Sequence, residues 1–234
     1  MQSDSIASSA VQARLFSLRD ERYRIFQSKL IPSVDPALVI GVRMPLLRQL
    51  ARELRHNRTD GAFLESLPHT YCEENNLHAL LLSEISDFDT VLAAVNRFLP
   101  FVNNWATCDS LRPRAFKNGD PRLDAAILQW LSSPHPYTLR FAIEMRMLHF
   151  LGSSFSVEYH AQIASIRKEE YYVKMMVAWY FATALAFQWE STLPYLAKPQ
   201  LDEWVARRAI QKAIESNRIS NEQKALLREI RATL

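Results

Sequence analysis

Residues 171–184 read YYVKMMVAWYFATA, and this stretch points to the kind of fold that the chain adopts. A helix through these residues is apolar on nearly every side, which is typical of a central helix buried by other helices. Lys174 and Trp179 are hard to place in such a helix unless they face a cavity or a groove. The alternative is a lysine that extends its charged end to solvent and a tryptophan that belongs to the core.

The composition around this stretch also favours an all-α fold. Only four glycines occur among 234 residues, whereas average usage predicts roughly 16. Tight β-hairpins and phosphate-binding loops both need glycine, so an all-β fold and a nucleotide-binding α/β fold are both disfavoured. Hydrophobic residues make up 48% of the chain and charged residues 23%, a balance that excludes a mainly disordered protein.

Apolar residues at helical spacing extend this prediction along the chain, as in the stripe of Leu46, Leu47, Leu50 and Leu54. The expected helices are 8–30, 45–57, 60–67, 71–85, 88–100, 104–112, 121–132, 136–151, 157–166, 169–187, 190–197, 200–216 and 221–231. Short helices joined by short turns favour antiparallel pairs. We therefore predict a single all-α domain over residues 1–234, an α-solenoid in which helix pairs stack on one another.

Charge is distributed unevenly, although the net charge is only +3. Residues 1–58 carry ten basic and five acidic side chains, the middle of the chain is acidic, and residues 202–234 are basic again. Basic ends are consistent with a surface for nucleic acid; the alternative, which charge alone favours, is that they are solvated helix faces.

The two cysteines, Cys72 and Cys108, have no metal-type spacing and favour a reducing compartment. The chain contains no uncharged apolar run of 18 residues, and its N-terminus lacks the apolar core of a signal peptide. We expect a cytoplasmic protein that does not enter a membrane.

Two local patterns contain residues suited to chemistry. In residues 103–110, NNWATCDS, a helix would place Trp105 and Asp109 on one face. An aromatic ring beside a carboxylate suits a cationic ligand or a carbocation-like centre; the alternative is a half-buried tryptophan with an aspartate at a helix end. Arg140 lies early in an apolar helix and either forms a surface ion pair or holds a phosphate. Metal-binding histidine spacings, nucleotide-binding loops and the GxSxG motif are all absent.

Five segments taken together resemble the DNA alkylation repair family, the AlkD-like DNA glycosylases built from HEAT-like helical repeats. They are IGVRMPLLR (40–48), NWATCD (104–109), LRFA (139–142), VKMMVAW (173–179) and RRAIQKAI (207–214). The segments occur in order and at compatible spacing across about residues 20 to 232. The resemblance is carried by the ordered set of segments rather than by any one motif.

The resemblance implies an enzyme that removes N3- and N7-alkylated purines from duplex DNA by hydrolysing the N-glycosidic bond. It implies that Asp109 stabilises positive charge on the deoxyribose and positions water. It also implies that Trp105 and Trp179 pack against the damaged nucleotide and that Arg140 holds a phosphate. Further phosphate contacts are expected from a set of basic side chains, namely Arg43, Arg48, Lys174, Arg207, Arg208 and Lys212. We expect double-stranded DNA with alkylated bases as the partner, a monomer, and neither a metal nor another cofactor.

The chain departs from the family pattern at two places. Leu148 and Ala182 stand where the best-known active members carry basic residues, and the segment 31–36 is longer than its counterpart. The longer segment leaves the family's lesion-side aromatic residue unplaced near Tyr23 or Phe26. Because some relatives bind DNA without excising bases, the alternative is a non-catalytic helical-repeat protein that binds DNA structures or a protein partner.

Overall fold

The computed structural model describes residues 2–197 and 200–234, and in these residues every regular element is a helix. The predicted all-α fold is therefore confirmed. The chain divides into two compact units, an N-terminal unit of Met1–Phe116 and a C-terminal unit of Lys117–Leu234. No described helix has the length and apolar character needed to cross a membrane.

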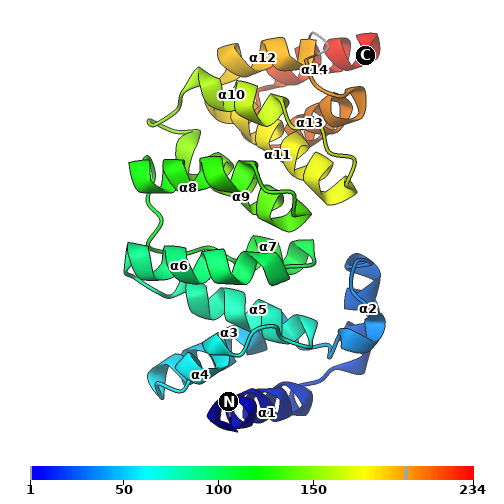
Figure 1. Ribbon diagram of the computed structural model, residues 1–234. Coiled ribbons are helices and arrows are strands. Elements are labelled where there is room, and N and C mark those ends of the chain that lie inside the picture. Colours follow the sequence, from blue (N-terminus) through cyan, green and yellow to red (C-terminus); the bar gives the residue numbers. More distant parts are fainter. Residues whose placement is uncertain (1, 198–199) are drawn as a thin grey trace. The chain divides into compact units, whose positions relative to one another are not determined.

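The N-terminal unit stacks helix pairs around a core that includes Leu47, Phe63, Leu77 and Leu81 (Figure 1). Helix α5 is at its centre and contacts α1, α3, α4, α6 and α7. The elements of the unit are α1 (Gln2–Ser17), α2 (Glu21–Leu30), the 3-10 helix η1 (Pro36–Leu38), α3 (Met44–His56), α4 (Asp60–Glu65), α5 (Cys72–Ser83), α6 (Phe88–Phe98), the 3-10 helix η2 (Leu99–Phe101) and α7 (Trp105–Ser110).

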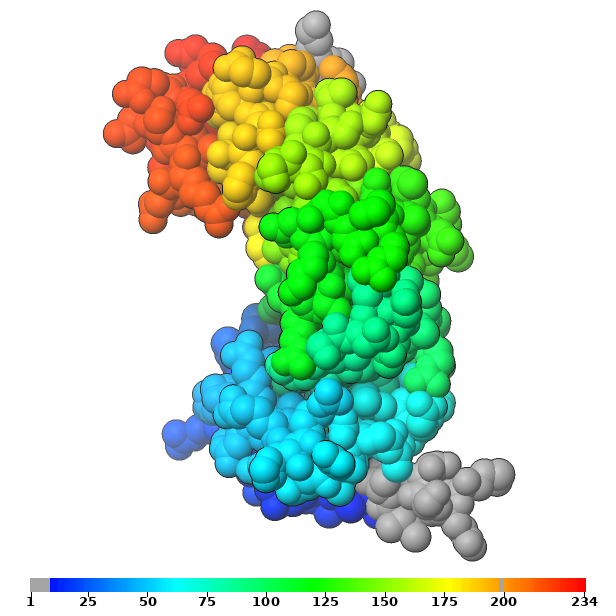
Figure 2. Space-filling model, turned by 90° about the vertical axis from the view of Figure 1, so that its left-hand side faces the viewer, coloured from blue at the N-terminus to red at the C-terminus, as the bar shows by residue number. Residues whose placement is uncertain are grey.

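The C-terminal unit repeats the same kind of packing. Its elements are α8 (Pro121–Leu131), α9 (Pro136–Phe150), α10 (Val157–Ala164), α11 (Tyr171–Phe187), α12 (Trp189–Ala197), α13 (Glu203–Glu215) and α14 (Asn221–Thr233). Helix α11 contacts α9, α10, α12 and α13, so the prediction that residues 171–184 form a central helix is confirmed. Stacked helix pairs within each unit are the arrangement of an α-solenoid. Figure 2 shows both units in space-filling form.

The prediction of one continuous helix over residues 8–30 was wrong. Residues 8–30 form two helices, because the chain leaves α1 after Ser17 and starts again at Asp20. The Asp20 side chain accepts a hydrogen bond from the Tyr23 N–H at 3.0 Å, which caps α2, and the Asp20 N–H donates to the Gly41 carbonyl at 3.0 Å. The new helix is therefore anchored to residues 40–43 rather than continuing α1.

Candidate functional site

The N-terminal unit contains a cavity of about 340 Å³ into which several predicted site residues face. Helix α7 supplies Trp105 and Asp109, one helical turn apart, and α3 supplies Arg48. The remaining walls come from α2, from the segment before and at the start of α3, from α5, and from other residues of α7, namely Tyr23, Phe26, Gln27, Leu30, Val42, Met44, Glu73, Asn76, Ala106 and Ser110. The cavity is thus aromatic on the sides of α2 and α7 and carries two carboxylates and one guanidinium.

Helix α7 has only six residues, and buried polar contacts fix where it begins. Asn104 is fully buried, and its side-chain oxygen accepts from the Thr107 N–H at 2.9 Å. The Asn104 amide donates to the Thr107 hydroxyl at 2.9 Å, and that hydroxyl donates to the Asn76 side-chain oxygen of α5 at 2.6 Å. These bonds satisfy polar groups inside the protein, and they hold the start of α7, and with it Trp105, against α5.

Trp105 is tied to α2 as well. Its indole Nε1–H donates to the Leu30 carbonyl oxygen at 2.8 Å, and its ring packs beside Ile31, Val34 and Val39. The tryptophan is half-buried, because one edge anchors the end of α2 while the ring lines the cavity. Trp105 is therefore a half-buried tryptophan whose ring lines a cavity, and its contact with a ligand stays a prediction.

Glu73, on α5, lines the same cavity as Trp105 and Asp109. Its carboxylate is buried and accepts hydrogen bonds from the backbone N–H groups of Ile40, Gly41 and Val42 at 2.9, 2.7 and 3.3 Å. Three amide donors disperse the carboxylate charge, so we assign Glu73 the task of holding the segment before α3. Nothing in the sequence marked Glu73 as buried, because an acidic residue in the first turn of a helix is usually exposed.

Tyr23 and Phe26, which the sequence left unplaced, both line this cavity. Their ring centroids lie 6.3 Å apart on one side of α2. Burial, and after it the negative charge of Glu73, raises the pKa of Tyr23. The guanidinium of Arg43 lies 4.8 Å from the Tyr23 ring centroid and forms an ion pair with Asp20 at 2.9 Å. Arg43 therefore packs beside the cavity and is not among its lining residues.

In the C-terminal unit, Trp179 and Lys212 line a second cavity, of about 350 Å³. Its other lining residues are Ala182, Thr183, Ala186, Glu215, Ser216 and Arg218. Ala182 occupies a position at which active members of the resembled family carry a basic residue, but here Lys212 and Arg218 provide positive charge to the same cavity. The sequence did not single out Arg218.

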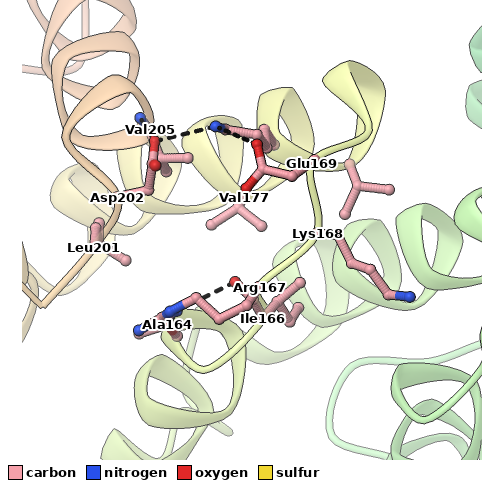
Figure 3. Close-up of a pocket in the computed structure, with 11 residues that line it drawn as sticks. Ala164, Ile166, Arg167, Lys168, Glu169, Val177, Leu201, Asp202 and Val205 are labelled. Carbon is pink, nitrogen blue, oxygen red and sulfur yellow. Dashed lines mark hydrogen bonds and ion pairs between the residues drawn. The ribbon is translucent and has the colours of Figure 1, made fainter.

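Arg140 and Lys174 lie outside the Trp179 cavity, although both belong to the C-terminal unit. The Arg140 side chain is 5% exposed, and its Nη1 donates to the Tyr172 carbonyl at 2.7 Å, which links α9 to α11. Lys174 borders a small cavity of about 40 Å³ and forms ion pairs with Glu169 at 3.5 Å and Asp202 at 3.3 Å (Figure 3). Its ammonium group also lies 5.4 Å from the Trp204 ring.

The two remaining basic residues, Arg207 and Arg208, are on α13. Arg207 forms an ion pair with Glu203 at 2.8 Å. Arg208 is exposed, and its guanidinium lies 5.4 Å from the Trp204 ring. The phosphate contacts predicted for these basic residues stay predictions. Within the protein, three of the side chains already form an ion pair with a carboxylate, namely Arg43, Lys174 and Arg207. Arg140 donates instead to a backbone carbonyl.

Comparison with known proteins agrees with the resemblance of the sequence segments. A search of curated proteins gives no significant match. Residues 11–213, however, match the family described as DNA alkylation repair enzyme. This match covers most of the chain and runs through both units. The chain therefore belongs to the DNA alkylation repair enzyme family.

Proposed function

We propose that the protein is a DNA glycosylase that hydrolyses the N-glycosidic bond of N3- or N7-alkylated purines in duplex DNA. The observation that carries the proposal is the cavity of the N-terminal unit, in which Asp109 lies one helical turn from Trp105 and faces the same space as Tyr23 and Phe26. Membership of a family of repair enzymes that act on alkylation damage supports it.

The chemistry of the lesion explains why such a cavity is suitable. Alkylation at N3 or N7 makes the purine cationic, so the base leaves readily without protonation by a general acid. When the bond between C1′ and the base nitrogen breaks, its electron pair goes to the purine, which departs as a neutral molecule. The positive charge moves to the deoxyribose as an oxocarbenium ion.

The residues of the cavity have complementary tasks in this reaction. The Asp109 carboxylate stabilises the oxocarbenium ion and orients water toward C1′, and the proton released when water adds passes to the carboxylate or to solvent. The faces of Trp105 and of Tyr23 attract the cationic nucleotide through their π electrons. In the C-terminal unit, Trp179 shares its cavity with Lys212 and Arg218, a combination of an aromatic ring and positive charge that suits DNA and its phosphates.

Base release tests this function directly. We expect the protein to release free 7-methylguanine from methylated duplex DNA and to leave an abasic site, and to release no base from the same duplex without methylation. Chromatography of the released bases measures the first product, and strand cleavage at abasic sites measures the second. Tight duplex binding without base release would instead support the non-catalytic alternative.

A further inference from the structure

A second cavity of the N-terminal unit, of about 330 Å³, is lined by four arginines, which we name the arginine pocket: Arg48, Arg52, Arg55 and Arg114. The first three lie on one face of α3, at intervals of four and three residues. Arg114 follows α7 in the chain. Helices α3 and α4 supply much of the light-blue to cyan surface that faces the viewer in Figure 2.

The positive charge of this pocket is only partly balanced. Arg55 forms an ion pair with Asp60 at 2.8 Å, and Arg114 forms one with Glu84 at 3.3 Å. Among the described residues, Arg48 and Arg52 have no ion-pair partner, although they lie one turn apart. Like charges at this spacing destabilise a helix. A bound anion would therefore reduce the repulsion between the Arg48 and Arg52 guanidinium groups.

The backbone around Arg114 is held firmly. Arg112 donates its N–H to the Ser83 hydroxyl at 2.8 Å, and Arg114 donates its N–H to the Ser83 carbonyl at 2.9 Å. These two bonds attach the segment after α7 to the end of α5. The backbone of the fourth arginine is thereby fixed at the edge of the cavity before any ligand arrives, which lowers the ordering cost of binding.

Arg48 connects the arginine pocket with the cavity of Trp105 and Asp109, because it lines both. An anion held by Arg48 and Arg52 would therefore lie next to a ligand in the candidate active site. Guanidinium groups are well suited to phosphate, whose oxygens they can bind in pairs. Because the two cavities share Arg48, they can hold neighbouring parts of one DNA strand: a nucleotide beside Trp105 and Asp109, and a phosphate in the arginine pocket.

We propose that the arginine pocket binds a backbone phosphate of the DNA strand whose damaged nucleotide lies in the cavity beside Asp109. This inference rests on the proposed function and adds Arg52 and Arg114 to the residues that contact DNA. Because the contact is made with the backbone, it serves undamaged and damaged duplexes alike and is independent of base sequence.

The test measures the affinity of Arg52→Ala for an undamaged duplex at several salt concentrations. Loss of one phosphate contact should weaken binding at low salt about tenfold and reduce the slope of log affinity against log salt by about 0.9. Arg52→Lys, which keeps the charge, should retain most of the slope. A slope for Arg52→Ala equal to that of the wild-type protein would overturn the proposal.

Arg97→Ala is the matched control, because it removes the same charge from the same unit outside the pocket. Arg97 is on α6 and is already neutralised by Glu65 at 2.7 Å, so its loss should leave the slope unchanged. Thermal melting of each variant shows whether it is folded. A reduction of the slope by Arg97→Ala as large as that by Arg52→Ala would mean a general charge effect and would also overturn the proposal.

Two further comparisons separate the possible outcomes. If inorganic phosphate binds the wild-type protein but not Arg52→Ala, while both bind DNA with the same salt dependence, the pocket takes free phosphate and the assignment to the DNA backbone fails. If the salt slope falls as expected but no methylated base is released, the pocket stands and the glycosylase function fails. If methylated bases are released but the slope for Arg52→Ala is unchanged, the glycosylase function stands and the phosphate contact fails.

Discussion

Gly41 shows how a single residue positions one wall of the candidate site. Its backbone has φ of +93°, a conformation that favours glycine. A Cβ atom there would lie 2.6 Å from the Asp20 carbonyl oxygen and 2.9 Å from the Arg24 Cα. The close approach lets the Asp20 N–H reach the Gly41 carbonyl, and it places α2, with Tyr23 and Phe26, beside the segment that Glu73 holds.

Gly41→Ala should therefore destabilise the protein by about 1–3 kcal/mol, through strain in the backbone and displacement of α2. Urea unfolding measures the change. Gly61→Ala is the matched control: Gly61 lies in α4 with nothing within 4 Å of an added Cβ, and alanine there should be neutral or stabilise by about 0.5–1 kcal/mol. Equal stability of the two variants would contradict this account of Gly41.

Trp105→Ala should weaken both duplex binding and base release, because the ring contributes to the bound state as well as to the transition state. The same substitution also removes the hydrogen bond to the Leu30 carbonyl, so a loss of stability is expected beside the loss of function. Trp105→Phe retains an aromatic face and should recover part of the affinity. Affinity and single-turnover rate that are both unchanged in Trp105→Ala would argue against a ligand in this cavity.

At the scale of elements, α7 depends on its cap to present Trp105 and Asp109. Asn104→Ala removes the bond to the Thr107 N–H and leaves the buried Thr107 hydroxyl without the donor that it now accepts from. We expect a loss of about 1–3 kcal/mol in the free energy of unfolding, measured in urea, with reduced base release even where the variant is fully folded. Full activity in a destabilised variant would show that the cap stabilises the unit without positioning the site.

Helices α4, α5 and α6 enclose a pair of histidines that makes the stability sensitive to acid. His69 Nε2 and His78 Nδ1 lie 2.8 Å apart. The His69 ring stacks on Phe63 and the His78 ring on Phe98, with centroids 4.4 and 4.2 Å apart. Burial lowers the pKa of His69 to about 4 and that of His78 to about 3.

The unfolded chain binds these protons near pH 6.5, whereas the folded protein does not bind them until about pH 4 or below. The free energy of unfolding should therefore be steady above pH 7 and fall as the pH drops from about 6.5 to 4, by up to about 1.4 kcal/mol per pH unit for each histidine. Urea unfolding across this range measures the slope. His78→Phe should reduce the slope, because it removes one of the two protons that only the unfolded chain binds in this range. A slope unaffected by His78→Phe would contradict this interpretation.

The pattern of apolar residues was enough to predict most helices, including α11, since helical periodicity reflects burial on one or more faces. It failed between α1 and α2, where the break depends on Asp20 bonding to Gly41, a distant residue in the chain. The pairing of Trp105 with Asp109 was predictable because both lie on one short helix. Tyr23, Phe26, Glu73 and the arginine pocket were not, because their placement depends on contacts between distant segments.

At the scale of the whole molecule, the family match extends from residue 11 to 213 and so includes predicted site residues of both units. Asp109, Trp105 and Arg48 belong to the N-terminal unit, and Trp179 and Lys212 belong to the C-terminal unit. The prediction of a single domain over residues 1–234 stays a prediction. The proposed function assigns roles to residues of each unit, and substitution of Asp109 in one or of Trp179 in the other should lower base release.

The rate of 7-methylguanine release by Asp109→Asn, measured in single turnover together with duplex affinity, tests the central claim most directly. The account predicts a rate about 10²–10³ times lower than that of the wild-type protein, with affinity close to wild type. This result is expected because the carboxylate acts mainly in the transition state while phosphates and aromatic rings provide the ground-state binding. Release at the wild-type rate, or a loss that follows a lowered melting temperature, would contradict the catalytic role of Asp109.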